Sequence, residues 1–198
     1  MPQLSLTDFV DIALRAGTPK LTKVREIKHR PKYEPATDFW RPLRMNIIEA
    51  HEGNRGVSHL SKSMVGLNDQ KKKTAYPPLV EAYKKWWGRK TYEWFKPPTG
   101  VWTSGTVAVS VNPELGLRAD GQEWIVKLYF KGDKLTKNRL DVILYLMKEV
   151  LGVDSAGATM AIHDIRNAKL FSPTIEIPDL GAMLRGEAAF IASVWEDV

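Results

Sequence analysis

The spacing of apolar residues changes near residue 100, and this change constrains the fold more than any other feature of the sequence. Before Pro97 the apolar residues recur mostly every three or four positions, whereas from Gly105 they alternate, beginning with Val107, Val109 and Val111. The first spacing is typical of amphipathic helices and the second of half-buried strands. We therefore expect a mostly helical first half followed by a β-containing layer, an α+β fold.

An Asp-Gly turn indicates a β-hairpin in the second half. Asp120 and Gly121 separate two alternating runs, and this dipeptide is a strong signal for a tight hairpin. In the second run, Trp124, Val126, Leu128 and Phe130 are expected to share the core face. Asn112, Pro113 and Glu114 interrupt the first run and predict a break or bulge. A helix over about 136–151, a strand over 159–171 with a turn at Arg166 and Asn167, and a helix from about 179 complete the layer.

The first half reads as helices joined by a basic connector. A short helix capped by Thr7 is expected to end near Gly17, and two more helices are expected over 38–52 and from Pro78 to Gly88. Prolines at both ends and sparse apolar residues predict an extended arm over 19–35. The segment PPTG at 97–100 divides a basic helical region (1–100) from an α+β region (101–198), as two units or as one continuous domain.

Composition excludes several classes of protein. With 198 residues, 43% of them hydrophobic and 26% charged, the chain has the composition of a globular protein. It has no cysteine, which excludes disulfides, thiolate metal sites and cysteine nucleophiles. The N-terminal segment lacks the pattern of a secretory leader, and no apolar run approaches the roughly 20 residues of a membrane span. We expect a cytoplasmic protein with no membrane segment and no cofactor.

Positive charge is concentrated in the first half. Residues 1–100 contain 19 Lys and Arg against 10 Asp and Glu, whereas residues 101–198 contain 10 against 13. Such asymmetry favours a polyanionic or acidic partner for the basic half. The leading hypothesis is non-enzymatic binding of DNA or RNA. The predicted phosphate contacts are Lys71, Lys72, Lys73, Lys84, Lys85, Arg89 and Lys90.

The stretch YKKWWGRKTYEWFK, residues 83–96, combines six aromatic residues with five Lys and Arg. This composition is found where bases stack on rings and cations neutralise phosphates. However, Tyr83, Trp86 and Trp87 share a helical face with Leu79 and Val80, which favours a core role for these rings. A second hypothesis is a protein partner or a homo-oligomer, assembled through the aromatic segment 86–102 and the final helix.

The stretch GVSHLSKSMVGLND, residues 56–69, has a local resemblance to part of a helix-turn-helix unit. Ser61 and Gly66 are five positions apart, where that pattern usually has four, and Pro77 and Pro78 fall in the expected recognition helix. A plain helical subdomain is the alternative. The resemblance is local, and no function is carried over from it.

The second hairpin strand offers another candidate surface. Lys127, Tyr129 and Lys131 alternate with the core residues, so they would form a shallow basic face if helices cover only the other side. The alternative is a solvated face on which the lysines guard against aggregation.

A metal-dependent enzyme acting on nucleic acid is the third hypothesis. His163, Asp164 and Arg166 form the densest polar cluster of the second half and are the weak catalytic candidates, with the hairpin acids Asp120 and Glu123. Glu123 and Lys127 are spaced too widely for a restriction-type nuclease motif. The other histidines, His29, His51 and His59, lack metal-ligand spacing and are expected at surface or cap positions. Phosphate-loop, dinucleotide-binding and serine-hydrolase motifs are not found, and no metal site is predicted.

Overall fold

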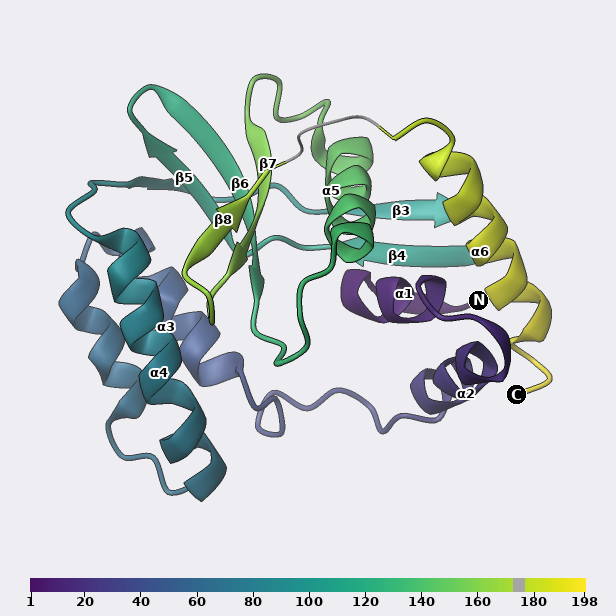
Figure 1. The fold of residues 1–198 in the computed structure, drawn as a ribbon, viewed down its shortest axis with the longest axis horizontal. Helices are drawn as coiled ribbons and strands as arrows, with labels where there is room; N and C mark the ends of the chain where they lie inside the picture. The colour runs from purple at the N-terminus through teal and green to yellow at the C-terminus, as the bar shows by residue number, and fades with distance from the viewer. Residues whose placement is uncertain (173–176) are drawn as a thin grey trace.

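The computed structural model describes residues 1–172 and 177–198 and confirms the α+β fold (Figure 1). The helices in the described residues are α1 (Leu6–Ala13), α2 (Gly17–Lys28), α3 (Arg41–Glu52), the 3-10 helix η1 (Val57–Met64), α4 (Gln70–Trp87), α5 (Lys137–Leu151) and α6 (Leu180–Val194). The strands are β1 (Gln3–Ser5), β2 (Glu93–Phe95), β3 (Gly100–Ser104), β4 (Val107–Val111), β5 (Leu115–Ala119), β6 (Gln122–Tyr129), β7 (Thr159–Asp164) and β8 (Lys169–Phe171).

The strands form two sheets. A three-stranded sheet has the order β1-β4-β3, and a five-stranded sheet has the order β2-β5-β6-β7-β8. The predicted hairpin joins β5 and β6, and Asp120 and Gly121 both have positive φ, 52° and 77°, as its two-residue turn requires. Helix α5 then crosses over, so that β7 lies parallel to β6. The predicted turn between 159 and 171 is also present and separates β7 from β8.

The five-stranded sheet lies between two hydrophobic cores. On one face, Ile125 of β6 and Ile162 of β7 pack with α1, α5, α6 and the three-stranded sheet. On the other face, Val126 and Leu128 pack against α3, η1 and α4. Both faces of β6 are therefore buried, because residues of alternating orientation meet a helical layer on each side.

The expected arm over 19–35 is wrong in its first part, where α2 forms instead. Pro19 lies in the first turn of α2, where a missing N–H leaves no intrahelical hydrogen bond unmade. The helix buries Val24 completely and packs Ile27 against the core of α1 and α5. The segment between α2 and α3 carries no helix or strand and runs along the bottom of the view in Figure 1.

Helix α4 begins eight residues before the predicted start at Pro78. Asp69 caps its N-terminus, since its Oδ1 accepts hydrogen bonds from the backbone N–H groups of Lys71 and Lys72 at 2.8 and 3.3 Å. Pro77 and Pro78 lie inside the helix. Proline lacks the backbone N–H of an interior helical residue, so packing of the buried face must offset the missing hydrogen bonds.

The interruption at residues 112–114 moves the chain from one sheet to the other. Before it β4 pairs with β1 and β3, and after it β5 pairs with β2 and β6. Glu114 anchors the crossing, because its carboxylate accepts hydrogen bonds from Lys127 Nζ at 2.6 Å and from the backbone N–H of Leu128 at 2.7 Å.

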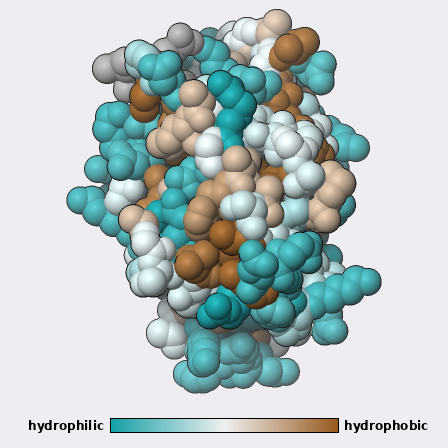
Figure 2. Space-filling view, turned by 90° about the vertical axis from the view of Figure 1, so that its right-hand side faces the viewer, coloured by the Kyte–Doolittle hydropathy of each residue, from teal (hydrophilic) through white to brown (hydrophobic). Residues whose placement is uncertain are grey.

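The N-terminal and C-terminal halves of the sequence share both sheets. Strand β1 pairs in parallel with β4, and β2 pairs antiparallel with β5. Figure 2 shows the side of the molecule that carries α2 and α6, where apolar side chains lie among hydrophilic ones. Of the helices in residues 1–172 and 177–198, none has both the length and the apolar character that crossing a membrane requires.

Candidate nucleic-acid interface

Helices α3 and α4 and the 3-10 helix η1 form a layer on one face of the five-stranded sheet, which we call the basic helical unit, residues 41–90. Figure 1 shows α3 and α4 at the lower left, away from α1, α2 and α6. Tyr76, Leu79, Val80 and Tyr83 line the buried face of α4 and are at most 1% exposed. This burial leaves the opposite side of α4 to solvent.

The net positive charge of the protein is concentrated in this unit. Residues 41–90 contain 11 Lys and Arg against four Asp and Glu, a net charge of +7, while the whole chain carries +6. Two of these 11 cations, Arg44 and Lys84, form ion pairs. The other nine form none with any residue that the structure describes: Arg41, Arg55, Lys62, Lys71, Lys72, Lys73, Lys85, Arg89 and Lys90. Their positive potential is not neutralised locally.

The predicted phosphate contacts fall into two groups at opposite ends of α4. Lys71, Lys72 and Lys73 occupy its first turn, where Lys71 and Lys73 are exposed and the Lys72 ammonium lies 5.8 Å from the centre of the Phe39 ring. The first group is about 20 Å from Lys85, given the helical rise of ~1.5 Å per residue.

The second group surrounds the C-terminal end of α4. Lys85, Arg89 and Lys90 are exposed. Lys84 differs from them, because its ammonium donates to Glu81 Oε1 at 2.8 Å and to Ser61 Oγ at 3.1 Å. The structure therefore places Lys85, Arg89 and Lys90 at the same end of α4. The Lys84 ammonium is instead held by Glu81 of α4 and Ser61 of η1.

Most rings of the stretch 83–96 are buried. Tyr83 is completely buried and Trp87 is 6% exposed, which confirms a core role for these two rings, and Tyr92 is also buried, at 9% exposed. Trp86 is half-buried and stacks on Tyr92 with ring centres 5.3 Å apart and planes inclined by 10°. It therefore presents part of its surface to solvent at the basic end of α4.

Two buried histidines lie under these rings, and sequence reasoning did not find this arrangement. His51 stacks on Trp87 with ring centres 3.8 Å apart, and its Nε2 lies 2.9 Å from Tyr83 Oη. His163 packs on Tyr83 and Trp86, and neither of its ring nitrogens has a hydrogen-bond partner among the described residues. Burial lowers the pKa of both histidines to about 3, and for His163 the charge of His51 adds to this effect.

Surface or cap positions were expected for His51 and His59, and this expectation is wrong. The two side chains are 3% and 6% exposed, because α3 and η1 face the core of α4. Nothing in their spacing indicates burial. The contact between His51 and Trp87 joins segments that are far apart in the sequence.

A small pocket opens beside this cluster. It has a cavity volume of about 120 Å³. Trp86 and Tyr92 form one side, while Leu117 of β5 and Trp124 of β6 belong to the sheet beneath. The charged residues that line the pocket are Lys90 and Asp120.

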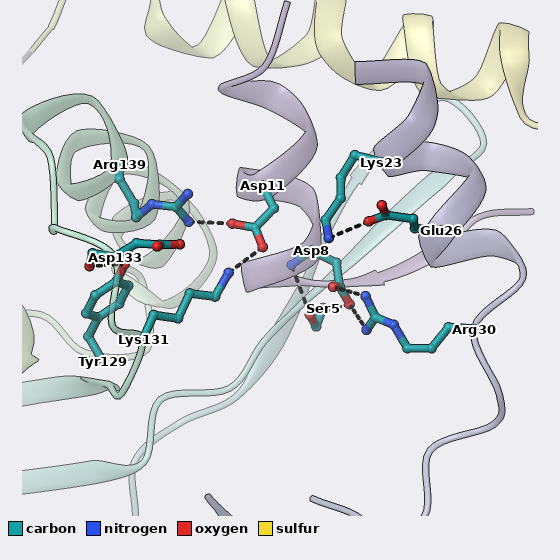
Figure 3. Close-up of polar contacts among 10 residues, drawn as sticks. All are labelled: Ser5, Asp8, Asp11, Lys23, Glu26, Arg30, Tyr129, Lys131, Asp133 and Arg139. Atoms are coloured by element: carbon teal, nitrogen blue, oxygen red, sulfur yellow. Dashed lines mark hydrogen bonds and ion pairs between the residues drawn. The ribbon is translucent and has the colours of Figure 1, made fainter. Parts of the chain in front are cut away.

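The face with Lys127, Tyr129 and Lys131 is not an open basic surface. Lys127 pairs with Glu114 at 2.6 Å, and Tyr129 is 7% exposed and donates its hydroxyl to the backbone carbonyl of Asp133. Lys131 is hydrogen-bonded to Asp11 of α1 (Figure 3). This side of β6 is covered by α1 and α5, so its cations serve internal contacts.

Asp11 links helices α1 and α5 and the segment after β6 on this covered face. Its carboxylate also accepts a hydrogen bond from Arg139 of α5 at 2.6 Å (Figure 3). Burial favours a higher pKa for Asp11, but the hydrogen bonds and charges of Lys131 and Arg139 outweigh it and hold the pKa below its usual value. The carboxylate thus stays charged and fastens α1 to α5 and to the segment that follows β6.

The polar cluster of the third hypothesis does not converge in the structure. His163 is buried, Asp164 accepts hydrogen bonds from the backbone and side chain of Asn167, and Arg166 is exposed in the turn after β7. Asp164 pairs in register with Tyr129 at one end of β6, whereas Asp120 and Glu123 lie at the other end. In the described part of the chain, no three His, Asp or Glu side chains gather closely enough to hold a metal ion.

The local resemblance to a helix-turn-helix unit does not extend to the backbone. Residues 57–64, which would supply an α-helix of that unit, form the 3-10 helix η1. The helix that follows, α4, contains both prolines and buries one face against the sheet.

Two comparisons of the sequence with known proteins found no match. No protein family model matches the chain, and no curated protein shows significant sequence similarity to it.

Proposed function

We propose that the protein binds nucleic acid, DNA or RNA, through the basic helical unit and without catalysing a reaction. The observation that supports this most directly is the net charge of +7 on residues 41–90, with nine of 11 cations outside any ion pair of the described chain. Elsewhere in the part of the chain that the structure describes, at least eight of 18 cations are held in ion pairs. Unpaired cations gathered in one unit neutralise phosphates and release condensed counterions, which is the sequence-independent part of nucleic-acid binding.

The proposed phosphate contacts are the two groups of cations at the ends of α4, of which all but the half-buried Lys72 are exposed. They are Lys71, Lys72 and Lys73 in its first turn and Lys85, Arg89 and Lys90 at its C-terminal end. Lys84 contributes less, because Glu81 and Ser61 already hold its ammonium. A cytoplasmic location, where nucleic acid is accessible, belongs to the same proposal.

The test is fluorescence anisotropy with labelled single- and double-stranded DNA and RNA. In the triple variant Lys85→Glu/Arg89→Glu/Lys90→Glu, we expect affinity to fall by at least tenfold, because repulsion replaces three phosphate contacts. The matched control is Arg25→Glu/Lys134→Glu/Arg185→Glu, which makes the same charge change at exposed positions outside the unit. Equal losses in both variants would show that binding depends on net charge alone, and no binding by the wild type would refute the proposal.

Assembly with a second protein or a second copy is the other candidate function. The favouring observation is α6, which exposes Met183 to 45% together with Ala182, Gly186 and Ala189. If this face associates, light scattering will show a mass that rises with protein concentration, changes little with salt and returns to the monomer value in Met183→Glu. A monomer at all concentrations would exclude self-association through α6.

A further inference from the structure

The pocket beside Trp86 has the lining of an aromatic-ring site. Trp86 and Tyr92 stack on each other, so the two rings form one rigid aromatic block at the side of the pocket. Trp124, Leu117 and Val126 supply apolar surface from the sheet. Faces of Trp and Tyr attract flat rings by stacking, in addition to the apolar area that a ring buries.

The size of the pocket matches a single ring system. Its volume is about 120 Å³. For comparison, a dry apolar cavity of about 150 Å³ binds benzene. The pocket is therefore too small for a whole nucleotide or a peptide segment, but it can take a ring whose remaining atoms stay outside.

The neighbouring charges indicate what such a ring is attached to. Lys90 lines the pocket, Arg89 precedes it in the chain, and Lys85 precedes Trp86 at the end of α4. These exposed cations belong to the second phosphate-binding group proposed above. A flat ring joined to an anionic backbone is the chemistry that fits an aromatic pocket beside unpaired cations.

The two charged side chains at the pocket fit the edge of a nucleobase. Lys90 can only donate hydrogen bonds, and the Asp120 carboxylate can only accept them. A base edge carries both ring or carbonyl acceptors and N–H donors, so it can satisfy both groups. A hydrocarbon ring would satisfy neither.

We propose that this pocket binds one unpaired nucleobase of a strand whose phosphates contact Lys85, Arg89 and Lys90. This inference rests on the proposed function and adds to it a preference for single strands, because a base must leave its duplex before it can enter the pocket and stack on Trp124.

The experiment compares three labelled probes of equal length by fluorescence anisotropy. They are a 12-nucleotide DNA strand of mixed sequence, its duplex, and an abasic strand that keeps the phosphates but lacks bases. We expect the wild type to bind the single strand at least fivefold more tightly than the abasic strand, since stacking on aromatic side chains contributes on this scale for each base. The duplex is expected to bind through its phosphates alone, without the additional affinity that stacking of a base gives the single strand.

Two pocket variants test the site from opposite directions. Trp124→Leu removes an aromatic surface, and Ala119→Leu fills the pocket from its floor. Both are expected to bind the single strand no better than the abasic strand while they keep the abasic affinity of the wild type. Phe190→Leu, which shortens a half-buried ring on α6, is the control and should leave all three affinities unchanged. Thermal unfolding checks that each variant is folded.

The outcomes separate this inference from the proposed function. Salt-sensitive binding of all three probes with equal affinity, unchanged in both pocket variants, would overturn the base pocket and leave the basic helical unit as a phosphate-binding surface. Failure of the wild type to bind any probe at low salt would overturn both.

Discussion

The buried histidines are the most unusual residues in the structure. His163 has no exposed surface and no hydrogen-bond partner in the described chain, and His51 uses one ring nitrogen, on Tyr83. Unsatisfied buried polar atoms are destabilising, because water solvates them in the unfolded chain. Stacking against Trp86 and Trp87 offsets part of this cost.

Burial of these histidines makes the stability of the fold dependent on pH. Their folded pKa of about 3 lies below the ordinary value of 6.5, so below pH 6.5 the unfolded state binds more protons than the folded state. The contribution of the two neutral histidines to the free energy of unfolding is therefore fully present above pH 6.5 and is lost as pH falls below it. Between pH 7.5 and 5.0 we expect urea denaturation to show a loss of about 2 kcal/mol for each histidine, roughly 4 kcal/mol in all.

The variant His163→Leu provides the control for this prediction. It should lose only about half as much stability between the two pH values, because one titrating ring remains. Equal stability of the wild type at pH 7.5 and 5.0 would show that these rings are protonated in the folded protein or exposed to solvent.

At the scale of elements, helix α4 depends on the cap at Asp69. Replacing Asp69 by Ala removes the acceptor for two backbone N–H groups and should cost about 1 kcal/mol, measured by urea denaturation. Faster hydrogen exchange in the first turn should accompany the loss and show that the segment of Lys71, Lys72 and Lys73 frays. Asp69→Asn should retain most of the stability, because asparagine caps nearly as well. A loss in Asp69→Asn as large as in Asp69→Ala would assign the effect to charge instead.

Elements with mutually consistent local signals could be predicted from the sequence. The helix expected over 136–151 is α5, where Thr136 is the N-cap, Gly152 is the C-cap and one face is apolar. The β5-β6 hairpin follows in the same way from Asp120 and Gly121. In both cases capping or turn chemistry agrees with the hydrophobic period.

Elements that depend on distant contacts could not be predicted. Helix α2 buries little besides Val24, so its sequence has too weak an apolar pattern to indicate a helix. The two prolines inside α4 obscured where that helix begins. The burial of both faces of β6 and the pairing of β1 with β4 require partners far along the chain. The candidate site was likewise predictable from the sequence only in part. The exposure of Lys85 follows from helical phase, whereas segments distant in the sequence form the pocket beside Trp86.

At the scale of the whole molecule, charge and structure divide the protein into two ends. The end with α1, α2, α5 and β6 neutralises many of its cations internally, as Asp11 does for Lys131 and Arg139. The end with the basic helical unit keeps a net charge of +7, so the remainder of the chain carries a net charge of −1. The electric field of such a charge distribution orients an approaching polyanion toward α3 and α4.

The salt dependence of single-strand binding tests the account most directly. If the six cations at the two ends of α4 contact phosphates, the logarithm of the affinity should fall linearly with the logarithm of salt concentration, with a slope of about −4. The variant Lys85→Glu/Arg89→Glu/Lys90→Glu should show a slope about half as steep. A slope near zero, or no binding at about 50 mM salt, would contradict the assignment of the basic helical unit as a nucleic-acid interface.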